Sequence, residues 1–139
     1  MKTSKWKFAL AAILVLAFFS NSMASKKDSE ISVTVQVNYG SQKAMRDTVI
    51  KVKAGVTALE ALQHVSKVAT HPKGNHVFVV SIDNVEGVRG VMAWYYEVNS
   101  KPTKKLAIFK RLKDGDVLTW IYRKDVCSCT VDKVCSVNK

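Results

Sequence analysis

The sequence predicts an α+β domain in which one helix packs across a small mixed β-sheet. Three observations indicate this class: two alternating segments joined by a turn signal, one capped amphipathic segment, and three further strand-like runs after it. A hairpin, a helix and then more strands is an order typical of a sheet with a helix on one face.

The first two strands are predicted from period-two alternation. Residues 31–39 alternate apolar and polar side chains without a break, which is typical of a half-buried strand. Gly40-Ser41 is a turn signal, and residues 47–53 read as a partner strand. Together the two segments predict a β-hairpin.

A helix is predicted over residues 58–69. Thr57 stands three residues before Glu60, the spacing of a capping box, in which each side chain accepts a hydrogen bond from the other residue's amide. The apolar side chains fall in one arc at about 100° per residue and the polar ones lie opposite, so the helix should cover a sheet. Pro72 and Gly74 are expected to end it.

Three more strands are predicted after the helix. Residues 77–82 are apolar on both faces, which is typical of a central strand buried beneath a helix. Residues 94–98 alternate, and residues 117–122 follow the turn signal Lys113-Asp114-Gly115-Asp116. These elements fit a β-grasp-like arrangement best.

Residues 1–24 have the three parts of a secretory signal peptide. Three lysines precede an apolar run from Phe8 to Phe19, and a polar stretch ends in Ser22-Met23-Ala24. The run is shorter than the roughly 20 apolar residues of a spanning helix, so cleavage is favoured over a retained anchor. We expect a secreted or periplasmic protein with no transmembrane segment after cleavage.

The remaining chain has the length of one domain. We expect a disordered spacer over 25–30, one domain over 31–126 and a Cys-containing tail over 127–139. The net charge of the whole chain is +11, and the leader contributes three lysines and no acidic residue. The mature protein would therefore remain strongly basic, which favours anionic partners but indicates no fold.

Two sequence blocks resemble a known family. They are Trp94-Tyr-Tyr-Glu-Val-Asn-Ser100 and Leu112-Lys-Asp-Gly-Asp-Val-Leu-Thr-Trp-Ile-Tyr122, supported by Gly55-Val-Thr-Ala-Leu-Glu-Ala-Leu62 and Val80-Ser-Ile-Asp-Asn-Val85. Over residues 31–122 the chain is similar to the C-terminal domain of the vitamin B12 carriers transcobalamin and intrinsic factor, and to its bacterial relatives.

The resemblance implies a binding domain for a small molecule, a corrinoid such as cobalamin, as ligand. In the vitamin carriers this domain is one of two that clamp the corrinoid, so a lone domain is expected to bind more weakly. The chain departs from the family at Asn84 and Ser100, two turn positions where Gly is usual. Asn tolerates a positive φ better than Ser does.

Ligand contacts are expected on the aromatic strand and beside it, at Trp94, Tyr95, Tyr96, Asn99 and Trp120. Aromatic side chains offer a large apolar contact with a polar tip. Strand alternation prevents all of them from pointing inward. Tyr95 is expected to face solvent or ligand, and the orientation of Trp120 stays open.

No enzymatic activity is expected. Asp114 and Asp116 flank a turn glycine and should shape that turn. The three histidines lack metal-ligand spacing, and the chain has neither a nucleophile elbow nor a phosphate-binding glycine loop. We therefore expect no catalytic residue, no metal site and no cofactor.

Positive charge is concentrated before the last strand, at Lys104, Lys105, Lys110 and Arg111. A solvated loop is the simplest interpretation, and specific nucleic-acid recognition is not expected without a recognised module. The alternative function is an envelope-attachment or protein-interaction domain that uses this loop and the tail cysteines.

The tail carries three cysteines, Cys127, Cys129 and Cys135. In an oxidising compartment we expect one disulfide, with Cys135 paired to either of the others and one thiol left for an intermolecular bond. A thiolate clip for a soft metal is the less favoured alternative.

Overall fold

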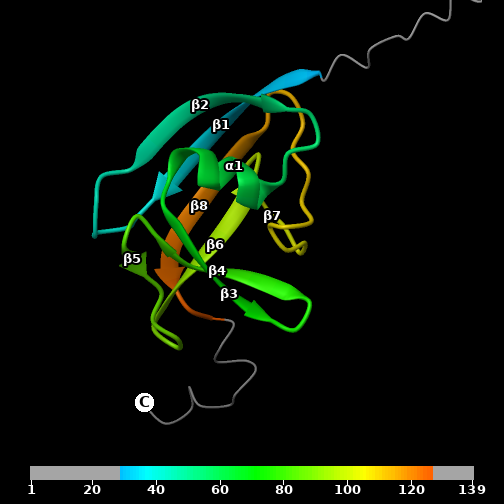
Figure 1. Ribbon diagram of the computed structural model, residues 1–139. Coiled ribbons are helices and arrows are strands. Elements are labelled where there is room, and N and C mark those ends of the chain that lie inside the picture. Colours follow the sequence, from blue (N-terminus) through cyan, green and yellow to red (C-terminus); the bar gives the residue numbers. More distant parts are fainter. Residues whose placement is uncertain (1–28, 127–139) are drawn as a thin grey trace, which may run out of the picture.

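A computed structural model describes residues 29–126 and confirms the α+β class, with one short helix and two sheets (Figure 1). Its elements are β1 (Glu30–Asn38), β2 (Arg46–Lys53), α1 (Ala58–Val65), β3 (Val68–Lys73), β4 (His76–Ile82), β5 (Val85–Glu86), β6 (Met92–Val98), β7 (Lys101–Pro102) and β8 (Val117–Lys124).

Several sequence-based expectations fall outside these residues. The leader, the tail cysteines and most of the spacer cannot be compared with the structure, although Glu30 already belongs to β1. Within residues 29–126, no helix is both long and apolar enough to cross a membrane. The signal peptide and the disulfide stay predictions.

The larger sheet has five strands in the order β2-β1-β8-β6-β7. The strands β1 and β2 form the predicted antiparallel hairpin, with Val33 opposite Ile50. The strands β1 and β8 pair in parallel, with Val35 opposite Leu118, and every other pair in this sheet is antiparallel. The sheet is therefore mixed, as predicted.

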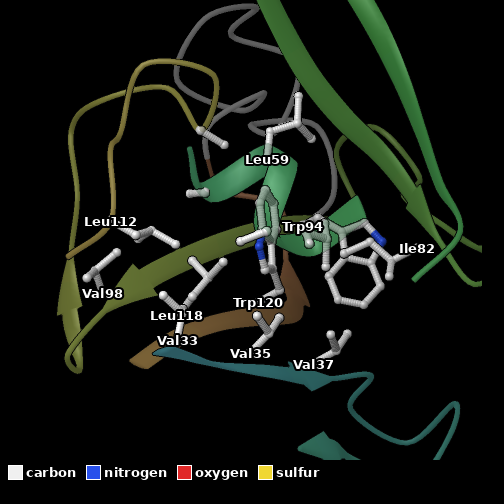
Figure 2. Close-up of a cluster of buried hydrophobic side chains, with 14 of the residues drawn as sticks. Val33, Val35, Val37, Leu59, Ile82, Trp94, Val98, Leu112, Leu118 and Trp120 are labelled. Carbon is white, nitrogen blue, oxygen red and sulfur yellow. The ribbon is translucent and has the colours of Figure 1, made fainter. Parts of the chain in front are cut away.

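The core lies between this sheet and α1. Val33, Val35 and Val37 of β1 and Leu118 of β8 are each at most 1% exposed. In Figure 2 these side chains gather with Trp120 on one side of the sheet. Leu62, Ala58 and Ala61 of α1 are fully buried over the same side, which leaves the opposite face of the sheet without a helix.

The helix is shorter than predicted. It ends at Val65, and residues 68–73, expected to include its last turn, form β3 instead. Arg46 donates hydrogen bonds to the Val65 carbonyl and the Ser66 hydroxyl, which holds the chain in an extended conformation there. Gly74, expected to end the helix, lies in the turn between β3 and β4.

The prediction that residues 77–82 form a strand buried on both faces is also wrong. The strand β4 is central only in a separate three-stranded sheet, β3-β4-β5. Phe78 and Val80 are 44% and 39% exposed, and only Ser81 and Ile82 are buried. The hairpin of β3 and β4 projects from the body because α1 is too short to cover it (Figure 1).

Two hairpins turn through residues in the left-handed conformation. Asp83 and Asn84 have φ of 48° and 67°, and Asn99 and Ser100 have φ of 53° and 59°. Each pair joins neighbouring antiparallel strands directly, as Ile82 pairs with Val85 and Val98 with Lys101. This is the geometry of a two-residue type I′ turn, which explains why the related family favours Gly at Asn84 and Ser100.

Replacing Ser100 by Gly should raise the free energy of unfolding by about 1 kcal/mol, because Gly adopts positive φ without steric cost. Chemical denaturation would measure the change. Ser41→Gly is the matched control, since Ser41 also lies in an exposed turn but is not among the positive-φ residues. An equal gain in both variants would contradict the explanation.

Candidate ligand-binding site

The predicted aromatic residues come from two neighbouring strands, β6 and β8. In their register Trp94 lies opposite Tyr122, and Tyr96 lies opposite Trp120. These four side chains share the face that α1 covers, whereas Tyr95 lies opposite Ile121 on the other face. Alternation therefore divides the predicted ligand contacts between two surfaces.

Trp94 belongs to the core. It is 8% exposed, its indole Nε1 donates to the Val85 carbonyl over 2.9 Å, and its ring meets the edge of Tyr39 at 5.7 Å between centroids. The ligand contact at Trp94 stays a prediction; in this structure the side chain lies on the face that α1 covers. The hydrogen bond from Trp94 to Val85 links β5 to β6 of the larger sheet.

Trp120 is also a core residue, at 2% exposed. Tyr96 stacks on it with 5.1 Å between ring centroids. Its Nε1 is the one buried side-chain nitrogen or oxygen of residues 29–126 that has no hydrogen-bond partner. A ligand contact at Trp120 stays a prediction, and it would require the Tyr96 ring to move.

Tyr96 connects the aromatic strand to the basic segment. Its ring is half-buried, and its hydroxyl donates to the Lys105 carbonyl. Burial raises the pKa of the Tyr96 phenol, against a smaller lowering by the Thr103 hydroxyl. The phenol therefore stays protonated at neutral pH and remains a donor to the segment that follows β7.

That segment, residues 103–113, is held by the first turn of α1. The Ala58 amide donates to the Lys110 carbonyl over 2.8 Å, and the Leu59 amide donates to the Ala107 carbonyl over 3.2 Å. The predicted capping box provides the next acceptor: the Glu60 amide donates to the Thr57 hydroxyl over 3.3 Å. The helix start thus fixes the segment's backbone instead of remaining open for a ligand.

The capping box is complete. The Thr57 amide donates to the Glu60 carboxylate over 2.8 Å. This bond, with a second from the Thr57 hydroxyl, lowers the pKa of Glu60. The charged carboxylate is therefore the form that the folded protein favours at the helix start.

The four predicted anionic-surface residues all reach the surface. Lys104, Lys105 and Arg111 are exposed, and Lys110 is half-exposed. Among them lies Phe109, which is 61% exposed. Sequence reasoning missed Phe109, although an aromatic residue between two basic pairs was a readable signal.

Asn99 has a structural role in the turn that precedes β7. Its Oδ1 accepts from the Val117 amide over 2.9 Å, and its Nδ2 donates to Asp116 over 2.8 Å. Asp116 also accepts from the Lys113 amide, and Asp114 accepts from the Ser32 amide. Asp116 therefore shapes its turn, as predicted, whereas Asp114 joins the turn to the start of β1. A ligand contact at Asn99 would compete with the bonds to Val117 and Asp116.

Tyr95 lies half-buried on the sheet face opposite α1. Its hydroxyl donates to Asp125 over 3.2 Å and accepts from the Val126 amide over 3.1 Å. The Arg123 guanidinium stands 4.6 Å from the ring centroid, within cation–π range. Contacts with Asp125, Val126 and Arg123 thus fix the orientation of the ring. Tyr95 is one of the predicted ligand contacts that is partly exposed at the surface.

The neighbours of Tyr95 make this face partly apolar. Ile121 lies opposite Tyr95, and Thr119 pairs with Gln36 of β1; all three are half-exposed. The Thr119 hydroxyl donates to the Gln36 amide oxygen over 3.1 Å. The face therefore offers apolar area together with hydroxyl and amide groups, which suits a flat ligand with polar substituents.

A second polar cluster, unnoticed in the sequence, surrounds Asp83. Its carboxylate accepts from the Tyr39 hydroxyl, from the Lys67 amide over 2.9 Å, and faces the Arg46 guanidinium at 3.2 Å. Burial alone would raise the pKa of Asp83, but the bonds from Tyr39 and Lys67 outweigh it and lower the pKa. The cluster joins β2, α1 and the β4–β5 turn.

A shallow surface hollow lies away from all the predicted ligand contacts. It has a volume of about 520 Å³ and lies beside β2 and α1, lined by Glu30, Lys51, Val52, Lys53, Gly55, Val56, Glu60 and His64. It is wide open to solvent, and its rim mixes both signs of charge. The aromatic strand contributes nothing to it.

Taken together, these features define a small α+β domain with a structural aromatic core and an oriented tyrosine on its helix-free face. The chain belongs to the family described as Domain of unknown function (DUF4430), whose model matches residues 55–124, half of the sequence. The match runs from the start of α1 to the end of β8. No curated protein matches the chain.

Two solved structures share the fold. Haptocorrin in complex with Cbi matches with a TM-score of 0.62 and 15% identity, over 70% of this chain and 26% of that one. A protein from Ruminococcus gnavus ATCC 29149, described as a candidate metal binding protein, matches with a TM-score of 0.52 and 16% identity, over 68% and 98% of the two chains. At these identities the likeness concerns the fold alone.

The two tryptophans should respond differently to replacement by Phe. Trp94→Phe removes a buried hydrogen bond to the Val85 carbonyl, whereas Trp120→Phe removes a nitrogen that has no partner. Trp94→Phe should therefore cost about 1–2 kcal/mol more in the free energy of unfolding. Urea denaturation would measure both, and an equal or larger cost at Trp120 would contradict the expectation.

Stability should depend on pH through Asp83. A carboxyl with a lowered folded-state pKa stabilises the fold above its unfolded pKa, and this contribution is lost as the pH falls through the folded value. When the pH is lowered from neutral to below about 4, the free energy of unfolding should fall more for the native protein than for the Asp83→Asn variant. Urea denaturation of both proteins at the two pH values would measure these losses. An equal loss of unfolding free energy in the native protein and in Asp83→Asn would contradict this assignment.

Proposed function

We propose that this domain is an exported, non-enzymatic binding module for a corrinoid-like small molecule. The observation that carries the proposal is the fold shared with haptocorrin, whose structure is a complex with Cbi. The sequence blocks around Trp94 and Trp120 support it, since they resemble the vitamin B12 carriers. Secretion is supported by the leader-like sequence of residues 1–24.

The proposed ligand surface is the helix-free face around Tyr95, Thr119 and Ile121. A corrinoid is a macrocycle with amide substituents, and this face is partly apolar and carries hydroxyl and amide groups. The Tyr95 ring is held by Asp125, Val126 and Arg123, so little side-chain entropy is lost on binding.

Affinity should be modest. The match covers 26% of the haptocorrin chain, so this domain corresponds to a small part of that protein. An open face buries one side of a ligand, whereas enclosed sites bury most of its surface. A second protein or a second domain that covers the other side would strengthen binding.

Absorbance titration with cobalamin and with cobinamide tests the proposal. Tyr95→Ala should weaken binding about tenfold, because an aromatic anchor in the centre of a contact typically contributes at least about 1.4 kcal/mol. Tyr95→Phe should retain most of the affinity, since it keeps the ring and loses only the hydroxyl bonds to Asp125 and Val126.

Phe78→Ala is the matched control, because Phe78 is an exposed aromatic residue of the other sheet. Each variant should first be shown to keep the native unfolding midpoint within the error of the measurement. The absence of any spectral change at high protein concentration would remove the corrinoid proposal. Equal losses in Tyr95→Ala and Phe78→Ala would remove the assignment of this face.

A further inference from the structure

Phe109 projects from a fixed backbone. Phe109 and Lys110 both donate through their amides to the Leu106 carbonyl, over 2.9 and 3.1 Å. Residues on either side are anchored: Ala107 is 6% exposed, and Leu112 is 3% exposed. The 61% exposure of Phe109 is therefore a consequence of how the segment folds, because the backbone around it is hydrogen-bonded on both sides.

Cationic residues flank Phe109 in the sequence. Lys104 and Lys105 precede it by a few residues, and Lys110 and Arg111 follow it directly. Among residues 29–126 none of these four forms an ion pair with a carboxylate. Arg111 instead donates to the Gly55 carbonyl over 3.3 Å. Arg111 also acts electrostatically on the Glu60 carboxylate and helps to lower its pKa, so within residues 29–126 the positive charge without an ion-pair partner belongs chiefly to the three lysines.

Three acidic side chains near the ends of the segment or at the helix start that holds it accept hydrogen bonds from other groups. Asp114 and Asp116 accept backbone hydrogen bonds from Ser32 and Lys113, and Glu60 closes the capping box with Thr57. Within residues 29–126 none of these carboxylates forms an ion pair with the lysines of the loop. The loop thus combines one exposed aromatic ring with a net positive charge.

We propose that residues 103–113 form a docking loop for an anionic lipid surface, in which Phe109 enters the interface and the flanking cations bind lipid headgroups. An exposed aromatic side chain and a basic cluster supply the two signals that interfacial binding requires, apolar burial and attraction to anionic lipid. A soluble polyanion would satisfy the cations but offers no apolar medium for Phe109.

The topology makes docking compatible with ligand binding. The docking loop lies where β6 ends and β8 begins, whereas the Tyr95 hydroxyl contacts Asp125 and Val126 beyond the far end of β8. The strand register also brings the start of β1 to the docking end, because β1 and β8 are parallel. Contact through the loop therefore leaves the helix-free face accessible.

Vesicle flotation of the mature chain, residues 25–139, tests the docking loop. The protein should bind vesicles of phosphatidylcholine with added phosphatidylglycerol, bind pure phosphatidylcholine much less, and lose binding as salt is raised. Phe109→Ala should weaken partitioning about tenfold. Neutralising each of the cations to Gln should weaken it about fivefold.

The matched control for the aromatic ring is Phe78→Ala, which removes an exposed Phe from the β3–β4 hairpin. Phe109→Trp should retain partitioning, because Trp also favours the interface. Both positions are exposed, so loss of binding with an unchanged unfolding midpoint reports on the surface and not on folding.

Three flotation results would overturn the proposal: no binding to either kind of vesicle, equal binding to both kinds, or equal effects of Phe109→Ala and Phe78→Ala. A fourth is that soluble polyphosphate competes fully with the vesicles and binds Phe109→Ala as well as it binds the native protein. The last outcome would assign the loop to a polyanion instead. Tyr95→Ala should leave flotation unchanged, so failure of the docking loop and failure of the corrinoid proposal are distinguishable.

Discussion

The parallel pairing of β1 with β8 is the constraint on which the rest of the structure depends. It joins Val35 to Leu118, near the two ends of the described chain, and both residues are fully buried. Parallel neighbours cannot be joined by a tight turn, so everything between them must act as one long connection. That connection contains α1, the smaller sheet and β6. It brings the chain back so that β8 pairs with the edge of β1 that β2 leaves open.

Backbone amides of α1 hold the last part of this connection, the segment before β8, in place. The first turn donates to carbonyls of the segment before β8, so the helix and the docking loop define each other's position. A helix start usually leaves its amides to solvent or to a cap, and here two of them bind another segment. The loop therefore owes its shape to a helix more than 40 residues earlier in the chain, and not to its own composition.

Local signals were readable in the sequence, and contacts between distant segments were not. The alternation of residues 31–39 and the capping box of Thr57 and Glu60 involve neighbours only, and both predictions are confirmed. The end of α1 depends on Arg46 and Asp83, which come from separate segments, so the predicted helix ran too far. Alternation also separated Tyr95 from Trp94 and Trp120 but contained no information on which face α1 would cover.

Tyr96 has a consequence for how the domain can be observed. Its ring stacks on Trp120, and its hydroxyl holds the Lys105 carbonyl, so a single side chain links the docking loop to a buried indole. Trp94 and Trp120 are the two tryptophans of residues 29–126, and their indoles have different surroundings, since one is hydrogen-bonded and the other is not. The protein therefore carries an intrinsic fluorophore beneath the loop, whose emission would register a displacement of that loop without any added label.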